Sequence, residues 1–215
     1  MNDNDLRTIG DEPVGPEQLL ALAERSSAEV LRQTTPSEVL MYWVWGSAWS
    51  IGFFGLWLTS GDEPFIDAHT AALWVHGALL VTAVVVTSVH IGRRVQGVYG
   101  PSTEVGRRLG TTWLVAFASY GLIMFGLDRV DGAGDVNSVL SPLLACLIVG
   151  VIFMAANTDL GGVAFVLGAW ILLMCGVAAL VGDSAFLLVM AIGGGGGFLV
   201  AAAIASRRLD HLAAR

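Results

Sequence analysis

The sequence predicts an all-α protein: a polytopic membrane bundle of six transmembrane helices, preceded by a short amphipathic helix in the cytoplasm. Hydrophobic residues make up 55% of the 215 residues and charged residues only 13%, whereas soluble domains have about 25% charged residues. The mean hydropathy is +0.71. The charges are missing from six long apolar runs, each close to the roughly 20 helical residues that cross a bilayer core.

The first 38 residues are polar and acidic, and they predict a cytoplasmic tail (1–38). Within it, the pattern PEQLLALAERSSAEVLRQ places apolar residues such as Leu19 and Val30 roughly on one face of a helix. Pro36 ends the pattern, because proline breaks a helix interior. We therefore expect a helix over about 17–33. It would lie on the membrane surface, on the protein's own cytoplasmic face, or against a cytoplasmic protein.

Six apolar runs predict the helices of a transmembrane domain over 39–206, followed by a second cytoplasmic tail over 207–215. The expected spans are 39–59, 68–91, 109–127, 139–156, 160–181 and 185–205. The fourth is the weakest, with Pro142 near its start, but proline is tolerated in the first turn of a helix. The N-terminal segment lacks the basic flank and short apolar segment of a cleavable signal peptide, so we expect the first span to direct insertion.

The arginines predict the orientation of the chain in the cell membrane. Of the 11 basic residues, all arginine, every one but Arg129 falls in the N-terminal tail, the second connection or the C-terminal tail. Cytoplasmic loops carry the excess of Lys and Arg in membrane proteins. We therefore expect a multi-pass protein with both termini in the cytoplasm, and with the acidic connections SGDEPFID, DRVDGAGD and GDS outside.

Composition also argues against several functions. The net charge of −7 comes mostly from acids in the N-terminal tail and short loops, so no nucleic-acid partner is expected. Cys146 and Cys175 each lie in the middle of an apolar run, which favours buried thiols over a disulfide framework. The spans contain no nucleophile–base pair and no metal-ligand cluster, and the glycine run lacks the Lys and Ser/Thr of a phosphate-binding loop. We expect no catalytic residues, no metal site and no enzyme activity.

The first span, MYWVWGSAWSIGFFGLWL, contains two tryptophans placed away from the membrane interface. Trp45 and Trp49 are one helical turn apart, nearer mid-depth, and share a face with Gly52. A buried Trp needs a partner for its indole N–H. These side chains could form the wall of a pocket for an aromatic or cationic ligand. The alternative is tight helix packing around the small residues of the span.

His76 and His90 both lie inside the second span. Their spacing puts them about 21 Å apart along a helix, which resembles the helix that holds two haems in the cytochrome b class. That class needs a second His-bearing helix, which only another copy of this chain could supply. His90, beside Gly92 and two arginines, is expected at the interface. His76 is the ligand-binding candidate, because ionisable groups at membrane depth are functional candidates; a hydrogen-bonded core histidine is the alternative.

The last span carries five consecutive glycines, Gly193, Gly194, Gly195, Gly196 and Gly197. In water each glycine weakens a helix by about 1 kcal/mol relative to alanine. In a bilayer the backbone polar groups must still be satisfied, so the run must be covered by protein or line a cavity. It predicts either close contact between helices or a flexible, unwound segment along a substrate path.

The order of features resembles a known group of proteins. A Leu/Ala/Glu/Arg helix precedes the Tyr/Trp/Gly-rich span LMYWVWGSAWSIGFFGLWL, and together they cover residues 17–60. This arrangement is similar to small actinobacterial six-helix integral membrane proteins of undetermined function. Members are sometimes labelled transporters and tend to be encoded beside winged-helix transcriptional regulators. The resemblance implies a regulated membrane function and names no site residues.

These features lead to one main functional expectation and two alternatives. The protein would transport or bind a small apolar or amphipathic molecule within a homo-oligomeric bundle in the lipid bilayer, without a cofactor. Trp45, Trp49, His76 and the glycines at 193–197 would line the site. The first alternative is a membrane sensor or anchor that engages a cytoplasmic protein through the helix at 17–33. The second is a haem-binding membrane protein.

Overall fold

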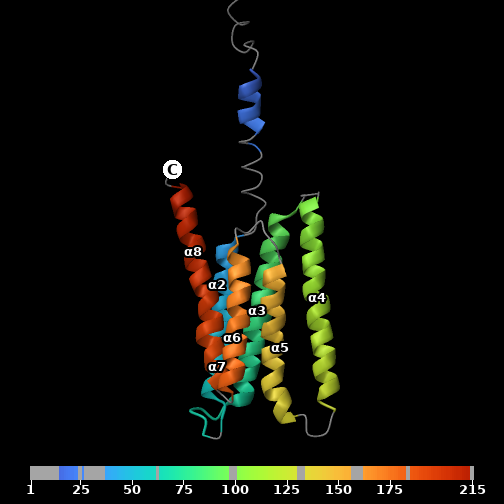
Figure 1. Cartoon of the computed structure of the whole chain (residues 1–215), viewed down its shortest axis with the longest axis vertical. Helices are drawn as coiled ribbons and strands as arrows, with labels where there is room; N and C mark the ends of the chain where they lie inside the picture. The colour runs from blue at the N-terminus through green and yellow to red at the C-terminus, as the bar shows by residue number, and fades with distance from the viewer. Residues whose placement is uncertain are drawn as a thin grey trace, which may run out of the picture.

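The computed structural model describes residues 15–23, 26, 37–61, 63–96, 101–129, 134–155, 162–182 and 185–213. Every regular element among them is a helix, so the predicted all-α class is confirmed. Figure 1 shows the long helices running side by side in one elongated bundle. Residues 16–23 form a helix with exposed side chains, but most of the remaining helix expected over 17–33 lies outside the described residues.

The first long helix, α2 (Glu38–Leu58), begins at a polar cap and ends at a hydroxyl. The Ser37 side chain accepts a hydrogen bond from the Leu40 N–H at the N-cap, which satisfies one of the free donors of the first turn. At the other end, the Thr59 hydroxyl donates to the carbonyls of Gly55 and Leu56. A turn then reverses the chain into α3 (His69–Arg94), which packs back along α2.

The next three helices are α4 (Pro101–Leu127), α5 (Gly134–Ala155) and α6 (Val163–Val181). Glycines in the left-handed region flank α6: Gly162 has φ +77° and Gly182 has φ +68°, a conformation that costs glycine little. The contact between α5 and α6 is the most extensive between any two described helices, whereas α4 packs mainly against α5. Figure 1 accordingly shows α4 at the edge of the bundle.

The last span is one continuous rod made of three helical pieces. It consists of α7 (Ala185–Val189), the π-helix η1 (Met190–Gly195) and α8 (Gly196–Ala213). A π-helix is a wider turn with i→i+5 hydrogen bonds; it is rare and frequently marks a functional site. The expected span over 185–205 is therefore present as a helix whose middle, at the start of the glycine run, is π-helical.

Five described helices are long and apolar enough to cross a membrane, which establishes a membrane protein by length and composition. They are α2, α3, residues 104–127 of α4, α6, and the last span over 185–208. The apolar part of α5, Leu140–Ala155, is shorter, and it coincides with the span that the sequence marks as weakest. In α3 the only buried residue is Ala83, and residues 104–127 of α4 bury none. Such apolar, exposed faces suit helices in contact with lipid.

Candidate functional site

The candidate site is built around α2, which contacts α3, α7, η1 and α8. Small residues of α2 allow this close packing. A Cβ on Gly46 would lie 2.8 Å from Leu199 Cδ2 and 3.0 Å from Phe198 Cβ. A Cβ on Gly52 would overlap the imidazole of His76. Small residues at helix interfaces let neighbouring backbones approach in this way, so the glycines of the first span determine which helices can touch it.

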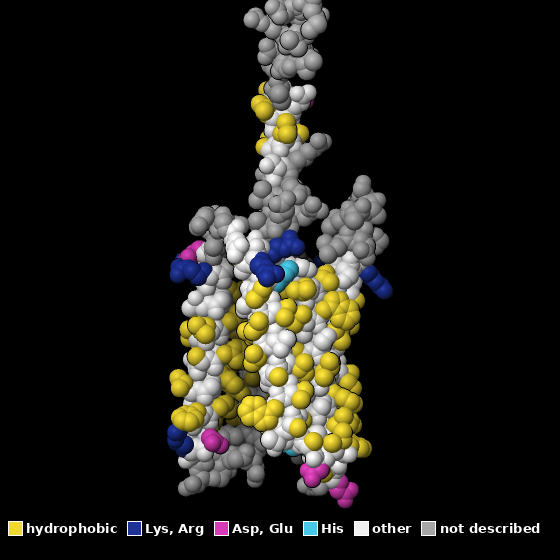
Figure 2. Space-filling view, turned by 180° about the vertical axis from the view of Figure 1, so that it is seen from behind, with side chains coloured by type: hydrophobic (Ala, Val, Ile, Leu, Met, Phe, Trp, Pro, Cys, Tyr) yellow, Lys and Arg dark blue, Asp and Glu magenta, His cyan; other side chains and the backbone are white. Residues whose placement is uncertain are grey.

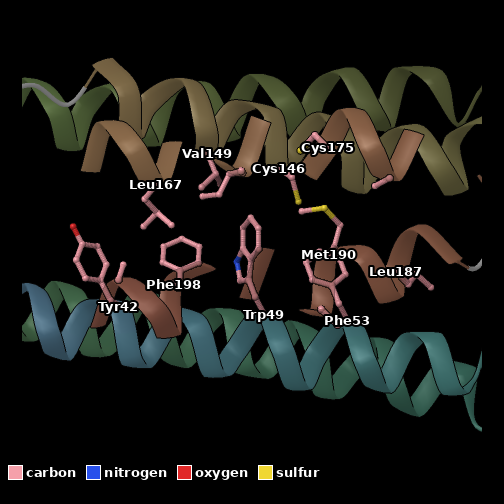
Figure 3. Packing of buried hydrophobic residues seen from close by; sticks show 14 of the residues in the cluster. Tyr42, Trp49, Phe53, Cys146, Val149, Leu167, Cys175, Leu187, Met190 and Phe198 are labelled. Carbon is pink, nitrogen blue, oxygen red and sulfur yellow. The ribbon is translucent and has the colours of Figure 1, made fainter. Parts of the chain in front are cut away.

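Trp49 belongs to the packed aromatic centre of the bundle. Its side chain is only 3% exposed. Its ring makes edge-to-face contacts with Phe53 and Phe198 at centroid distances of 5.6 Å and 5.4 Å, and a Cβ on Gly194 would lie 3.1 Å from Trp49 Cε3. Figure 3 shows the indole reaching from α2 toward the α5–α6 pair. These surroundings favour the tight-packing interpretation of Trp49.

Trp45 uses its indole N–H to join α2 to α3. Its Nε1 donates a hydrogen bond of 3.1 Å to the Thr87 hydroxyl, and the side chain is half-buried. This bond gives the indole N–H the acceptor that a buried Trp needs. Trp45 and Trp49 therefore leave α2 toward different neighbours: Trp45 toward α3, and Trp49 toward the core.

His76 and His90 of α3 both contact α2 or its N-cap. The imidazole of His76 lies against Gly52 and the Phe53 ring, with a centroid distance of 4.8 Å to Phe53. His90 Nε2 accepts a hydrogen bond of 2.9 Å from the backbone N–H of Ser37, at the start of α2. A haem ligand at His90 Nε2 would have to give up this bond. His76 and His90 thus meet α2 at two levels, Gly52–Phe53 and Ser37.

Four of the five glycines contact neighbouring helices. Residues 193 and 197 face α6: a Cβ on Gly197 would lie 2.6 Å from Trp170 Cδ1, and one on Gly193 would overlap the Met174 side chain. Residues 194 and 195 face α2, whereas a Cβ on Gly196 would meet nothing within 4 Å. The run therefore lies between α2 and α6, with one open position.

Two side chains satisfy carbonyl groups of the π-helix. The Ser50 hydroxyl of α2 donates a hydrogen bond of 3.2 Å to the Ala191 carbonyl. The Trp170 indole N–H of α6 donates one of 2.8 Å to the Gly193 carbonyl. An irregular helix at membrane depth needs such partners for its backbone groups. The π-helix is therefore held on two sides, each time by a single side-chain hydrogen bond.

Two buried polar side-chain atoms have no hydrogen-bond partner in the described part of the chain. These atoms are Tyr42 Oη and His76 Nδ1. Unsatisfied buried polar atoms are uncommon in native structures and call for an explanation, such as a water, a ligand or a catalytic role. Tyr42 of α2 is 3% exposed and points into the core. The centroid of its ring is 6.4 Å from that of Phe198.

The structure adds residues that the sequence did not single out. Thr87 and Trp170 each provide one half of a hydrogen bond between helices, and Phe198 is a fully buried contact of Trp49. A Thr inside an apolar span is a usable signal, because hydroxyls in membrane helices often join neighbours. Among the described residues, no group of three His, Cys, Asp or Glu is placed to hold a metal ion.

No family model, curated protein or solved structure matches this chain. The resemblance of residues 17–60 to the small actinobacterial six-helix proteins therefore stays a prediction. The structure itself defines the class: a helical membrane protein in which a π-helical segment of the last span lies between the first and fifth expected spans.

Proposed function

We propose that this chain transports or binds a small apolar or amphipathic molecule within its helical bundle, as a homo-oligomer in the cell membrane. Five apolar helices and the shorter α5 provide the bundle. The proposed site has two parts on different sides of α2: Trp45 and His76 at the contact with α3, and Trp49 with the glycine run where η1 contacts α2 and α6. The apolar surfaces that α3 and α4 expose would face lipid or another copy of the chain.

We further propose that α5 crosses as the sixth span and that both termini are cytoplasmic. The support is the distribution of charge along the bundle. Figure 2 shows dark blue basic side chains mostly at one end of the bundle, and acidic ones mostly at the opposite end. An even number of crossings is what puts the basic ends of α3, α4 and α8 on one side, as the positive-inside rule requires.

The observation that carries the functional proposal is the π-helix inside a membrane-spanning rod. Transporters recurrently build binding sites from helices that are interrupted at mid-depth; the π-helix is a milder irregularity within a continuous helix. Here the two carbonyls that accept from Ser50 and Trp170 are held by one side-chain bond each. Such a segment has two arrangements within reach, bonded and released, which is what a binding or gating step needs.

Tryptophan fluorescence and flux measurements test this proposal. Purified protein is titrated with amphipathic dyes, with ethidium as the cationic member of the panel, and the same dyes are loaded into proteoliposomes. We expect saturable quenching and protein-dependent flux. Trp170→Phe keeps the ring but removes the donor to Gly193, so flux should fall roughly threefold to twentyfold, because hydrogen bonds between membrane helices contribute about 0.6–1.7 kcal/mol.

Trp57→Phe is the matched control for that variant. Trp57 packs against the rings of Phe54 and Phe65 near the α2–α3 turn, away from η1, so this variant should transport like the wild type. If every dye fails to quench saturably and no flux is seen, the transport proposal is wrong. Equal losses of flux in both Trp variants would show that the hydrogen bond from Trp170 to the π-helix has no specific role in transport.

The alternative function is that of a membrane sensor or anchor with a cytoplasmic protein partner. The helix at 16–23 favours it, because Leu19, Leu20 and Leu22 are 56%, 63% and 59% exposed. Exposed leucines on a short helix suit a helix-in-groove partner. Binding of dye without flux, together with a soluble protein that co-purifies only when residues 17–33 are present, would favour this function over transport.

A further inference from the structure

Three sulfur-bearing side chains from α5, α6 and η1 lie in the buried core, beside the glycine run of the proposed ligand site. Cys146 of α5 is 2% exposed, Cys175 of α6 is 6% exposed, and Met190, the first residue of η1, is completely buried. All three belong to the same buried cluster. Figure 3 shows the ends of the Cys146 and Met190 side chains pointing toward one another, with Cys175 beside them.

The crossing of α5 and α6 places the two thiols together. The helices touch backbone to backbone at Gly150 and Gly168: a Cβ on Gly168 would lie 2.6 Å from the Gly150 carbonyl oxygen. A Cβ on Gly150 would also lie 2.8 Å from Leu172 Cγ. Cys146 is four residues before Gly150, and Cys175 is three residues after Leu172. Because the helices run in opposite directions, both cysteines lie at the same level and on the contacting faces.

From this placement we infer that Cys146, Cys175 and Met190 form a binding site for a soft monovalent metal ion of the Cu(I) and Ag(I) class. Thiolate and thioether sulfurs are the ligands that select Cu(I), whereas carboxylates and water suit Mg²⁺, Ca²⁺ and Mn²⁺. The described residues place no third His, Cys, Asp or Glu with the two thiols, so the donor set is two thiols and a thioether. The inference is independent of the molecule that the bundle transports.

The charge balance of such a site suits an apolar core. A bound M⁺ displaces the proton of one thiol, which leaves the bundle, and the resulting thiolate–metal pair is neutral while the second thiol and the thioether donate lone pairs. No oxidation or reduction of the protein is involved. A neutral site avoids the large free-energy cost of a net charge away from water. Because Met190 begins the π-helix, a bound ion would tie η1 to the α5–α6 pair.

Silver(I) is the probe, because it binds the same ligands and does not change oxidation state under the conditions of the assay. The purified full-length protein, with thiols reduced and the reductant removed, is incubated with Ag(I) and passed over a thioether-bearing chelating resin. The resin removes free Ag(I), and the silver that stays bound to the protein is measured by elemental mass spectrometry. We expect about one Ag(I) per chain. Cys146→Ser and Cys175→Ser should each lose it, and Met190→Leu should bind at least about tenfold more weakly.

Met124→Leu on α4 is the control for a methionine outside the cluster, and it should bind like the wild type. Melting curves of all variants identify any that fail to fold, and Cys146→Ala replaces Cys146→Ser if the hydroxyl unfolds the core. Wild-type silver retention in Met190→Leu would overturn the three-ligand site. A 146–175 disulfide that persists in the reduced protein, read as the loss of two alkylatable thiols, would overturn metal binding by this pair.

Discussion

Gly195→Ala is expected to destabilise the protein, by about 1–3 kcal/mol or more. The new methyl carbon would lie 2.6 Å from the backbone nitrogen of Ser50 and 2.9 Å from its Cα. Backbone atoms cannot move away by a change of rotamer, as a flexible side chain can, so α2 and η1 must separate. Insertion of a methyl group into a packed core typically costs 1–3 kcal/mol. Melting curves in detergent measure the loss, and the Ser50–Ala191 hydrogen bond should weaken with it.

Gly196→Ala is the matched control for this variant. It adds the same methyl group one residue further along, where nothing lies within 4 Å. Alanine is the better helix former by about 1 kcal/mol, so the melting temperature should stay the same or rise slightly. Equal effects of the two substitutions would mean that α2 and η1 do not touch at Gly195. The functional interpretation of the glycine run would then lose its structural basis.

Gly168→Ala is expected to have the other large effect, at the α5–α6 crossing. Its Cβ would lie 2.6 Å from the Gly150 carbonyl oxygen and 2.7 Å from the Met154 backbone nitrogen. Both are backbone atoms, so the two helices must move apart along their most extensive contact. We expect a loss of stability of about 1–3 kcal/mol and weaker Ag(I) retention, because the separation also pulls Cys146 away from Cys175.

Gly176→Ala on the same helix serves as the comparison. No atom lies within 4 Å of its added methyl group, so both stability and Ag(I) retention should resemble those of the wild type. If Gly168→Ala melts like Gly176→Ala, the backbone contact between α5 and α6 is wrong. In that case the placement of the two cysteines at one level would also lose its explanation.

Much of the fold could be predicted from the sequence, because a long apolar run is a strong indicator of a membrane helix. The expected span over 39–59 corresponds to α2 at Glu38–Leu58. Other helices extend beyond their apolar runs: α4 begins at Pro101 and α8 continues to Ala213. Hydropathy marks only the part of a helix that suits lipid, so it misses polar turns that continue into water. For the same reason α5, whose apolar part is short, could not be assigned as firmly as the others.

The candidate site could be predicted only in part. Helical periodicity alone places residues 193 and 197 on the same face, and both do face α6. The partners of these glycines could not be predicted, because they depend on how α2 and α6 pack around the last span. The pairing of Trp45 with Thr87, and of Trp170 with the Gly193 carbonyl, joins residues 42 and 23 positions apart. The π-helix likewise could not be predicted, because half of it is glycine, which carries no side-chain pattern.

The accessibility of single cysteines shows on which side of the membrane each connection lies. The proposed bundle crosses six times and has both ends in the cytoplasm. Glu63→Cys, Asp128→Cys, Gln96→Cys and Arg207→Cys are made in a background where Cys146 and Cys175 are alanine. Intact cells are treated with an impermeant maleimide. We expect residues 63 and 128 to label in intact cells, and 96 and 207 only after lysis. If residues 207 and 63 are both labelled from outside, the number of crossings between them is even and α5 does not cross. That result would rule out the six-crossing bundle.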